Sequence, residues 1–409
     1  MHSDAEGLGQ LTVRNMKAHE YPAVKEIVAR SFEDHVRDNP DALDQYAEEP
    51  WYDPDHLLVA ESAGKIVSQM GVREGSLWIS GCAFPAGLVG TVCTLPEWRG
   101  KAIGARMLAA AHTWMGQRGI ALSYLHTSEA RYGFYGRAGY RLSVIEQPKV
   151  TVQGAAGLGP AGVKRRDARE TGIRVRPAGP EDAAVCNRIY EAHYGRMAGA
   201  WSRSGTFWRR RLAGKPKLWL SGIPSYRLAE VEGVPVAYLA AVRGRELRVI
   251  ELAALPGQAL AAEVLLAEAI GEAEGDVEIS MGAWDPLWET LASYDPGDFC
   301  SRGHVFVRME DLAAFEGAAV SHLADRADSL GLTCAIELRS SRRAICVGSG
   351  KRRISVELED SDLCALVYNG RRLPELLELG VVGMEGVREG DLEALFPDTH
   401  PARCPVDGY

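Results

Sequence analysis

Apolar and polar positions along the first 152 residues follow two different periods. Near the start, a short strand-like run precedes a helical pattern in which Val24, Ile27 and Val28 fall on one face. Residues 56–95 then alternate as an antiparallel meander, with an Ala-Gly turn signal between its first two strands. The pattern predicts a mostly antiparallel sheet with flanking helices, which is an α+β fold.

The run from Leu88 to Trp114 changes character twice. It begins apolar and β-prone, breaks at Pro96, and passes through small residues with Arg99 and Lys101 into a helical pattern. A helix that opens on small residues leaves its first backbone N–H groups unpaired, and they point outward with the positive end of the helix dipole. The run therefore predicts a strand, a tight loop and a helix that form an anion site suited to phosphate.

The pattern also predicts the remaining elements of the first unit and the linker that ends it. Residues 121–128 predict a buried strand, and residues 129–143 predict a short helix and a turn before a last strand near 144–150. Residues 153–172 are rich in Gly and Ala, then charged, and have no apolar period. That composition is typical of a surface linker between domains.

Residues 173–303 repeat the opening order of elements: a strand with x-V-R, an amphipathic helix, a hairpin, and then a strand, Pro256 and a helix. The loop after Pro256 has no Arg or Lys and no R-G-K-x-x-G pattern. We expect this second copy to keep the scaffold without the phosphate chemistry. Residues 304–409 predict a third, α+β unit with a long helix, short alternating strands and two further short helices.

Composition narrows the possible functions. The chain has 409 residues, enough for two or three domains, and 46% apolar with 25% charged residues is ordinary for a soluble globular protein. A net charge of −9 without a basic tract argues against nucleic-acid binding. No apolar run approaches a membrane span, and the N-terminus has no signal-peptide core. The eight cysteines form no C-x-x-C pair and the ten histidines no metal-ligand spacing, so we predict a cytoplasmic protein with reduced thiols and no metal.

The segment 33–61 has an unusual charge balance, with ten Asp or Glu residues against one base, Arg37. One interpretation is a solvated acidic helix and loop. The other is the mouth of a site that attracts a cationic substrate.

Two motifs in the first unit resemble signatures of a known family. RGKAIG, at Arg99–Gly104, resembles the acyl-CoA signature Q/R-x-x-G-x-G/A of the GNAT acetyltransferases, and FYGRAGY, at Phe134–Tyr140, resembles the second signature of that fold. The order of the three units resembles the enhanced intracellular survival family of acetyltransferases. The resemblance implies a catalytic GNAT domain at 1–152, a degenerate GNAT domain at 173–303 and a sterol-carrier-like domain at 304–409. It also implies a homo-oligomer, a hexamer.

The same resemblance implies how acetyl-CoA is bound. The pyrophosphate lies on the loop, and the pantetheine arm lies along a strand that splays from its neighbour. The loop residues are Arg99, Gly100, Lys101, Ala102, Ile103 and Gly104; the strand residues are Val92, Cys93 and Thr94; and Ser128 stands where many GNAT enzymes carry an Asn that contacts CoA. We interpret Cys93 as a small packing residue rather than a nucleophile. Ala102 replaces a glycine of the family pattern, and we expect it to begin the helix with a negative φ.

For catalysis, the predicted general acid is Tyr135. A phenol with a pKa of about 10 can protonate a departing thiolate over hydrogen-bond distance. Tyr132 and Tyr140 are rivals, although Tyr140 has the place of a core residue. The resemblance assigns the general base to the C-terminal carboxylate, here that of Tyr409. The other candidate bases are Glu33, Asp34 and His126.

The acceptor is predicted to be an amine, which is cationic when free, so acids and aromatic faces would hold it. The candidate contacts are Phe32, Glu33, Asp34 and Trp51. The leading hypothesis is an acetyl-CoA-dependent N-acetyltransferase that acts directly on an aminoglycoside-like molecule, a polyamine, an amino sugar or a lysine side chain. The alternative is a lipid-binding or small-molecule-binding protein that uses the third unit and keeps the GNAT fold as a scaffold.

Overall fold

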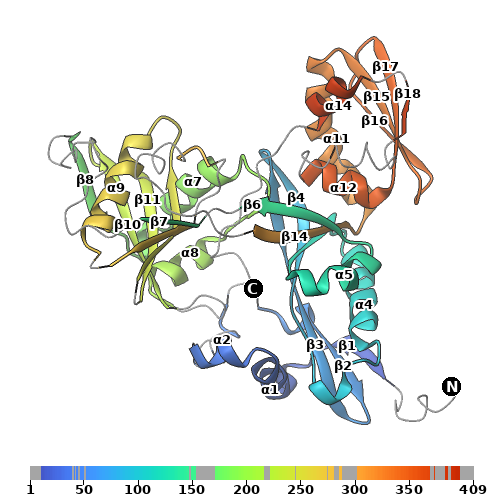
Figure 1. Cartoon of the computed structure of the whole chain (residues 1–409), viewed down its shortest axis with the longest axis horizontal. Coiled ribbons are helices and arrows are strands. Elements are labelled where there is room, and N and C mark those ends of the chain that lie inside the picture. Colours follow the sequence, from blue (N-terminus) through green and yellow to red (C-terminus); the bar gives the residue numbers. More distant parts are fainter. Residues whose placement is uncertain are drawn as a thin grey trace.

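The computed structural model of the chain has three lobes, each built on its own sheet (Figure 1). It describes residues 11–38, 41, 43–44, 47–49, 52–146, 149–152, 171–215, 222–244, 246–273, 275–280, 285–287, 302–368, 373, 383–385 and 388–396. No helix in these segments combines the length and the apolar character that a bilayer crossing requires.

The first sheet is mostly antiparallel, in the order β1-β2-β3-β4-β5-β14-β6, with β9 added beside β3. Its strands are β1 (Thr12–Asn15), β2 (Leu57–Ser62), β3 (Lys65–Ile79), β4 (Cys82–Thr94), β5 (Leu122–His126), β6 (Arg141–Glu146), β9 (Ala200–Trp201) and β14 (Arg302–Met309). The turn between β2 and β3 forms at Ala63 and Gly64, which both have positive φ, as two-residue hairpins prefer. The predicted meander is therefore confirmed.

Helices cover both faces of this sheet (Figure 1). They are α1 (Tyr21–Ser31), α2 (Glu33–Asp38), α4 (Ile103–Gln117) and α5 (Tyr132–Arg137), with single 3₁₀ turns at η1 (Ala18–Glu20), η2 (Pro54–His56), η3 (Pro96–Trp98) and η4 (Glu129–Arg131). Because side chains alternate along β2, Leu57 and Val59 pack with α1, whereas Leu58 and Ala60 pack with α4. The predicted apolar face of α1 is buried at all three positions.

The second lobe repeats this plan in a sheet of order β7-β13-β12-β11-β10-β8. Its elements are β7 (Lys149–Val152), β8 (Ile173–Pro177), η5 (Pro180–Asp182), α7 (Ala183–Tyr194), α8 (Gly205–Leu212), β10 (Pro224–Val231), β11 (Val234–Arg243), β12 (Leu247–Ala254), α9 (Ala259–Gly271) and β13 (Val277–Ser280). The strand–helix–hairpin–strand–helix order is that of β1, α1, β2, β3, β4 and α4.

The two lobes exchange strands across the predicted boundaries. β7 follows β6 in the chain but pairs with β13 of the second sheet. Conversely, β14 pairs with β5 and β6 and so closes the first sheet. Alternation of apolar residues predicts that a strand exists but does not specify its partner, which is why the sequence did not indicate this exchange.

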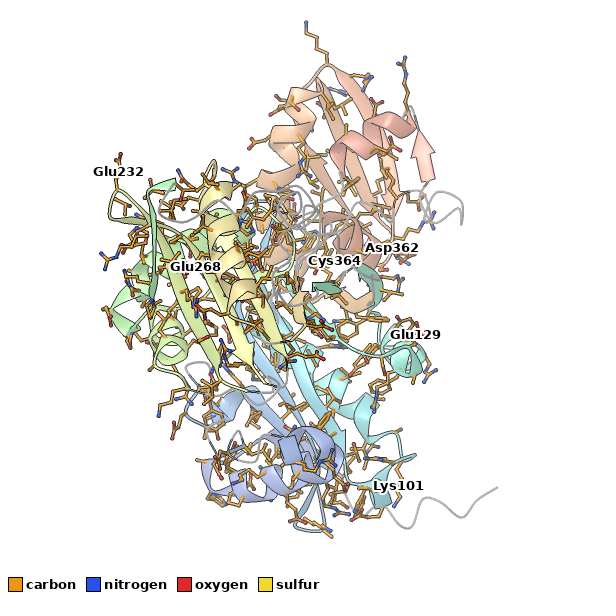
Figure 2. All side chains as sticks on the ribbon, turned by 60° about the vertical axis from the view of Figure 1, so that its left-hand side comes forward. Lys101, Glu129, Glu232, Glu268, Asp362 and Cys364 are labelled. Carbon is orange, nitrogen blue, oxygen red and sulfur yellow. The ribbon has the colours of Figure 1, made fainter. Side chains whose placement is uncertain are left out.

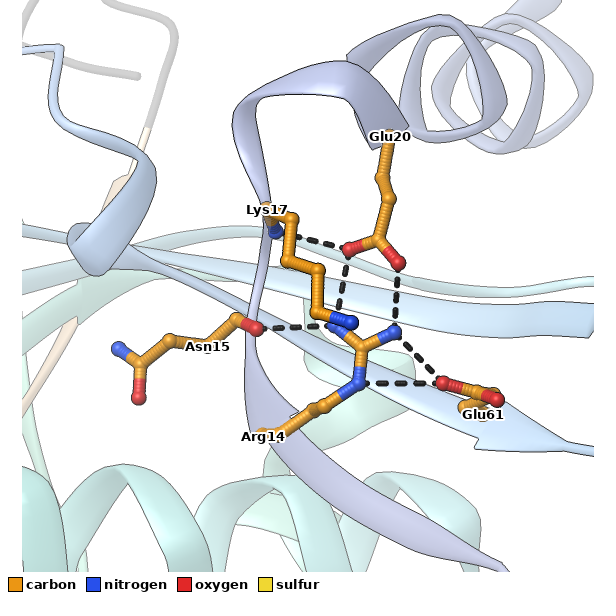
Figure 3. Close-up of polar contacts among 5 residues, drawn as sticks. All are labelled: Arg14, Asn15, Lys17, Glu20 and Glu61. Carbon is orange, nitrogen blue, oxygen red and sulfur yellow. Dashed lines mark hydrogen bonds and ion pairs between the residues drawn. The ribbon is translucent and has the colours of Figure 1, made fainter. Parts of the chain in front are cut away.

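A charge cluster at the start of each copy is repeated as well. In the first copy, Arg14 on β1 lies between Glu20, at the end of η1, and Glu61 on β2, with N–O distances of 2.6 Å to each (Figure 3). Its pairing holds the pKa of Glu20 at about 2. In the second copy, Arg176 contacts Asp182 at 2.7 Å and Glu230 at 2.6 Å. The cluster joins the first strand, the first helical turn and the neighbouring strand in both copies.

The third lobe is an α+β unit with a sheet of order β16-β15-β17-β18. Its elements are α11 (Leu312–Ser329), β15 (Leu332–Leu338), β16 (Arg343–Val347), β17 (Arg352–Leu358), α12 (Asp360–Tyr368), β18 (Gly383–Glu385) and α14 (Glu389–Leu395). Asp362 of α12 bonds Arg141 of β6 at 2.7 Å. Figure 2 shows Asp362 and Cys364 on this helix, well away from Lys101 near the start of α4.

Candidate active site

The central strands of the first sheet separate partway along their length. β4 pairs with β5 in parallel only from Ala86 to Leu88, opposite Leu122 to Tyr124. Beyond that point β4 continues to Thr94 without β5 as a neighbour. A cavity of about 850 Å³ opens there, lined by the end of β4, the following loop, α4, α5 and the end of α1. The predicted splay of this strand is thus present.

Eight of the ten residues predicted to bind the donor line this cavity. They are Val92, Cys93, Thr94, Arg99, Gly100, Ala102, Ile103 and Gly104. Lys101 is exposed, and its ammonium lies 4.6 Å from the ring centre of Trp98, which does line the cavity. Ser128 precedes η4 and is exposed, and the cavity wall is formed instead by its neighbours Ala130 and Arg131.

The expected backbone conformation of Ala102 is wrong. Ala102 is the N-cap of α4 and has φ 55° and ψ 17°, in the left-handed region. The chain must reverse sharply between Gly100, with φ 78°, and the first turn of the helix, and this geometry favours glycine. Ala102 therefore carries a strain on the order of 1 kcal/mol.

Three cationic side chains surround the cavity. Arg99 bonds the carbonyl of Thr94 through Nε at 3.1 Å, which ties the loop to the end of β4. Arg131 and Arg137 line the cavity from α5 and the turn before it. Neither was among the residues predicted from the sequence, although Arg137 lies within the FYGRAGY motif. Together with the N–H groups at the start of α4, they form an electropositive site suited to phosphates.

Tyr135 lies on α5 with its side chain buried and lining the cavity. Burial raises the pKa of its phenol above the usual value, so the proton is retained at neutral pH. Its ring packs edge-on against Phe134 and Tyr140. It also packs at a tilt against Phe306, whose ring centre is 6.2 Å away on the exchanged strand β14. The position of the candidate acid thus depends on a residue far along the chain.

Of the two rival tyrosines, Tyr140 is buried and lies 2.9 Å from Ser123 Oγ, as expected for a core residue. Tyr132 packs on Phe306 with ring centres 5.2 Å apart. Neither is among the residues that line the cavity, whereas Tyr135 is. Geometry therefore favours Tyr135.

His112 also lines the cavity and was not predicted from the sequence. It lies on the α4 face that also presents Gly104 and Leu108 to the cavity, so the four-residue spacing was the available signal. Burial, with help from nearby Arg308, lowers the pKa of His112 to about 3, so the ring is neutral. Its Nε2 is 3.9 Å from the Glu310 carboxyl, whose pKa burial raises to about 7.

Cys93 has the surroundings of a packing residue. Its side chain is buried, and burial raises the pKa of the thiol to about 11. A thiol that stays protonated at neutral pH is a poor nucleophile. Among the described residues, no group of three His, Cys, Asp or Glu side chains forms a metal-binding cluster.

The predicted acceptor contacts are only partly placed. Phe32 lines the cavity at the end of α1, and Glu33 is exposed at the start of α2. Asp34 lies in α2, whereas Trp51 and Tyr409 fall outside the described residues. His126 ends β5 with Nε2 2.7 Å from the hydroxyl of Tyr124.

Several residues of the acidic segment have structural partners. Glu49 is buried and bonds Arg211 of α8 through both carboxylate oxygens at 2.8 Å. Asp44 pairs with Lys25. The segment therefore joins the first lobe to the second. For Glu49, this observation favours a structural role over a role in attracting a cationic substrate.

Comparison with known proteins finds a family match for residues 12–143 and a fold for the whole chain. Residues 12–143 match the family model described as an acetyltransferase (GNAT) domain. The structure resembles a GCN5-related N-acetyltransferase from Kribbella flavida (19% identity, TM-score 0.70), covering 98% of this chain and 100% of that one. It also resembles Eis1 from Mycobacterium abscessus (16% identity, TM-score 0.67), covering 97% and 100%. No curated protein matches the sequence. The expected α+β GNAT architecture is confirmed.

Proposed function

We propose that this chain, an N-acetyltransferase whose residues 12–143 form a GNAT acetyltransferase domain, transfers an acetyl group from acetyl-CoA directly to the amine of a small cationic molecule or a lysine side chain. The observation that carries the proposal is a single cavity that brings together the phosphate-type loop, the open end of β4 and Tyr135. Among the described residues of the third lobe, no comparable observation favours the second candidate, lipid binding.

The residues present fit an acyl-CoA. The N–H groups from Arg99 to Gly104 and the guanidinium groups of Arg99, Arg131 and Arg137 would hold its phosphates. The backbone of Val92 to Thr94, which has no paired β5 strand beside it, would bind its pantetheine amides. A volume of about 850 Å³ is that of a cofactor-sized cleft.

Acetyl-CoA would supply the acetyl group as a thioester. The acceptor first loses one proton to solvent and attacks as the neutral amine. A nitrogen–carbon bond then forms and the carbon–sulfur bond breaks, so the sulfur gains one proton and the nitrogen loses one. Tyr135 would provide the first proton, because its raised pKa keeps the phenol protonated and it lies in the cavity wall.

For the second proton, we keep the α-carboxylate of Tyr409 as the proposed base, with Glu33, Asp34 and His126 as alternatives. A terminal carboxyl has a pKa of about 3.5, so it would accept the proton efficiently only if burial raised that value. Deleting Tyr409, or extending the chain beyond it, is expected to abolish turnover without weakening acetyl-CoA binding. Unchanged turnover would assign the base elsewhere.

The direct test is release of free thiol from acetyl-CoA with a panel of amines that includes polyamines, aminoglycosides, amino sugars and lysine peptides. We expect thiol release that depends on one amine class and a matching acetylated product by mass spectrometry. Failure of acetyl-CoA to bind in calorimetry, combined with lipid that co-purifies with the protein, would favour the alternative function.

A further inference from the structure

β4 contains a strained residue just before the part that lines the cavity. Thr91 has φ 46°, in the left-handed region, where a β-branched side chain is unfavourable. The ladder between β3 and β4 shifts register here: Gly71 pairs with Gly90 and Gln69 with Cys93. Two residues of β4 thus face one of β3, which is a β-bulge that bends the strand.

The side-chain amide of Gln69, on the opposite strand β3, hydrogen-bonds the backbone of this bulge. Its Nε2 donates to the carbonyl of Thr91 and lies 3.4 Å from the Cys93 sulfur. The neighbouring hydroxyl of Ser68 donates to the Cys93 carbonyl at 2.8 Å and lies 2.8 Å from Thr94 Oγ1. Gln69 and Ser68 are both buried, so these bonds are shielded from water. The carbonyls of Thr91 and Cys93 are thereby held on the side of β3.

The second lobe has a different residue at the matching position. Tyr238 pairs with Ala253 in the ladder as Gln69 pairs with Cys93. Cys93 and Ala253 correspond because each lies three residues before the Pro that follows its strand. The Tyr238 hydroxyl bonds the side chain of Glu251 at 3.0 Å. No residue of β12, all of which is described, has a positive φ. In β4 the bond from Gln69 to the Thr91 carbonyl occurs together with a left-handed residue, whereas β12 has no left-handed residue.

We propose that Gln69 is a positioning residue for the acyl donor, because its amide holds Thr91 in the left-handed bulge that keeps Val92 to Thr94 turned into the cavity. The inference rests on the proposed function for the identity of the donor, acetyl-CoA. It assigns Gln69 no contact with the donor. The residue acts through the backbone of β4.

The test is a rescue experiment on acetyl-CoA affinity. Gln69→Met keeps the length of the side chain and removes the amide, so the dissociation constant measured by calorimetry is expected to rise on the order of tenfold. Thr91→Gly is expected to restore affinity in the Gln69→Met background, because glycine adopts a positive φ without strain. The hydroxyl of Thr91 is buried without a hydrogen-bond partner, so the replacement removes no such bond.

Two measurements make the outcome decisive. Urea unfolding of each variant shows that it is folded, and Tyr238→Phe, which removes the bond at the matching position of the second lobe, is expected to leave acetyl-CoA affinity within a factor of about two. Unchanged affinity in Gln69→Met, or a loss in the folded variant that Thr91→Gly does not recover, overturns the assignment. If the wild type binds acetyl-CoA but transfers no acetyl group, the proposed function fails while the role of Gln69 is still tested by binding.

Discussion

The two GNAT-like lobes share the Arg cluster at their first strand and differ in the loop that follows their central strand. Both have the Arg cluster that joins the first strand to the first helical turn, at Arg14 and at Arg176. Residues 95–102 separate β4 from α4, whereas only residues 255–258 separate β12 from α9. The longer connection contains the cationic, glycine-containing loop. Architecture alone therefore requires neither the four extra residues nor their charges.

The ends of the two central strands differ in the same sense. Val92 and Thr94 are half-buried and line a cavity, whereas Leu252 and Ala254 are buried. In the second copy, the hydroxyl of Tyr194, at the end of α7, bonds the carbonyl of Leu252 at 3.1 Å. In the second copy, a side chain of the protein thus hydrogen-bonds the strand backbone at the position that corresponds to Val92, which lines the cavity in the first copy. We infer that the donor site proposed for the first copy requires this strand end to stay uncovered.

The largest effect is expected from disrupting the strand exchange. Phe306 on β14 is buried against Tyr132 and Tyr135, so Phe306→Ala leaves a cavity and should lower the free energy of unfolding by about 3–5 kcal/mol. It should also lower kcat, because Tyr135 loses a packing partner. Chemical denaturation measures the first effect. Val234→Ala, at an exposed position of the second lobe, is the control, and an equal loss there would contradict the account.

Replacement of the candidate acid should affect rate more than binding. Tyr135→Phe removes only the hydroxyl, so kcat is expected to fall about 100-fold with an unchanged dissociation constant for acetyl-CoA. Tyr132→Phe is the matched control and should keep most of the activity. Because burial raises the pKa of Tyr135, the wild-type rate should show no loss from ionisation of this phenol below about pH 10. A full rate in Tyr135→Phe removes it from the mechanism.

The contact between the lobes provides a test of the acidic segment. Glu49→Gln weakens the buried, two-pronged bond to Arg211, so unfolding should cost about 2 kcal/mol less while kcat/KM for the amine stays near that of the wild type. Glu48→Gln, at an exposed carboxylate that pairs with Arg210, should change stability by less than about 0.5 kcal/mol. A selective loss of affinity for cationic amines in Glu49→Gln would instead show that the acidic segment attracts the substrate.

The smallest expected effect is a gain in stability. Ala102→Gly should raise the free energy of unfolding by about 0.5–1 kcal/mol, because glycine relieves the left-handed strain at the N-cap of α4. Ala63→Gly, in the β2–β3 turn with φ 49°, should give a similar gain without any change in acetyl-CoA affinity. A lower stability in Ala102→Gly would show that the alanine side chain contributes packing at this position.

Much of the first lobe could be predicted from local pattern. The face of α1, the β2–β3 turn and the strand–loop–helix around Pro96 depend on neighbours in sequence, so their residues indicate them directly. Five of the six predicted loop residues, all but Lys101, also line one cavity.

Other features depend on partners that are distant in sequence. The exchange of β7 and β14, the packing of Phe306 on Tyr135 and the bond from Glu49 to Arg211 join segments more than 100 residues apart. The left-handed conformations of Ala102 and Thr91 are imposed by the surrounding fold against the preference of each residue. A pattern of residue types does not carry this information.

The central claim is that only the first copy holds an acyl donor, and calorimetry of acetyl-CoA binding tests it most directly. Ala105 is exposed and lines the cavity on α4, whereas Ala259 is exposed at the start of α9. We expect one binding site per chain, abolished by Ala105→Trp and unaffected by Ala259→Trp. Two sites per chain, or a loss of binding with Ala259→Trp rather than Ala105→Trp, would contradict the account.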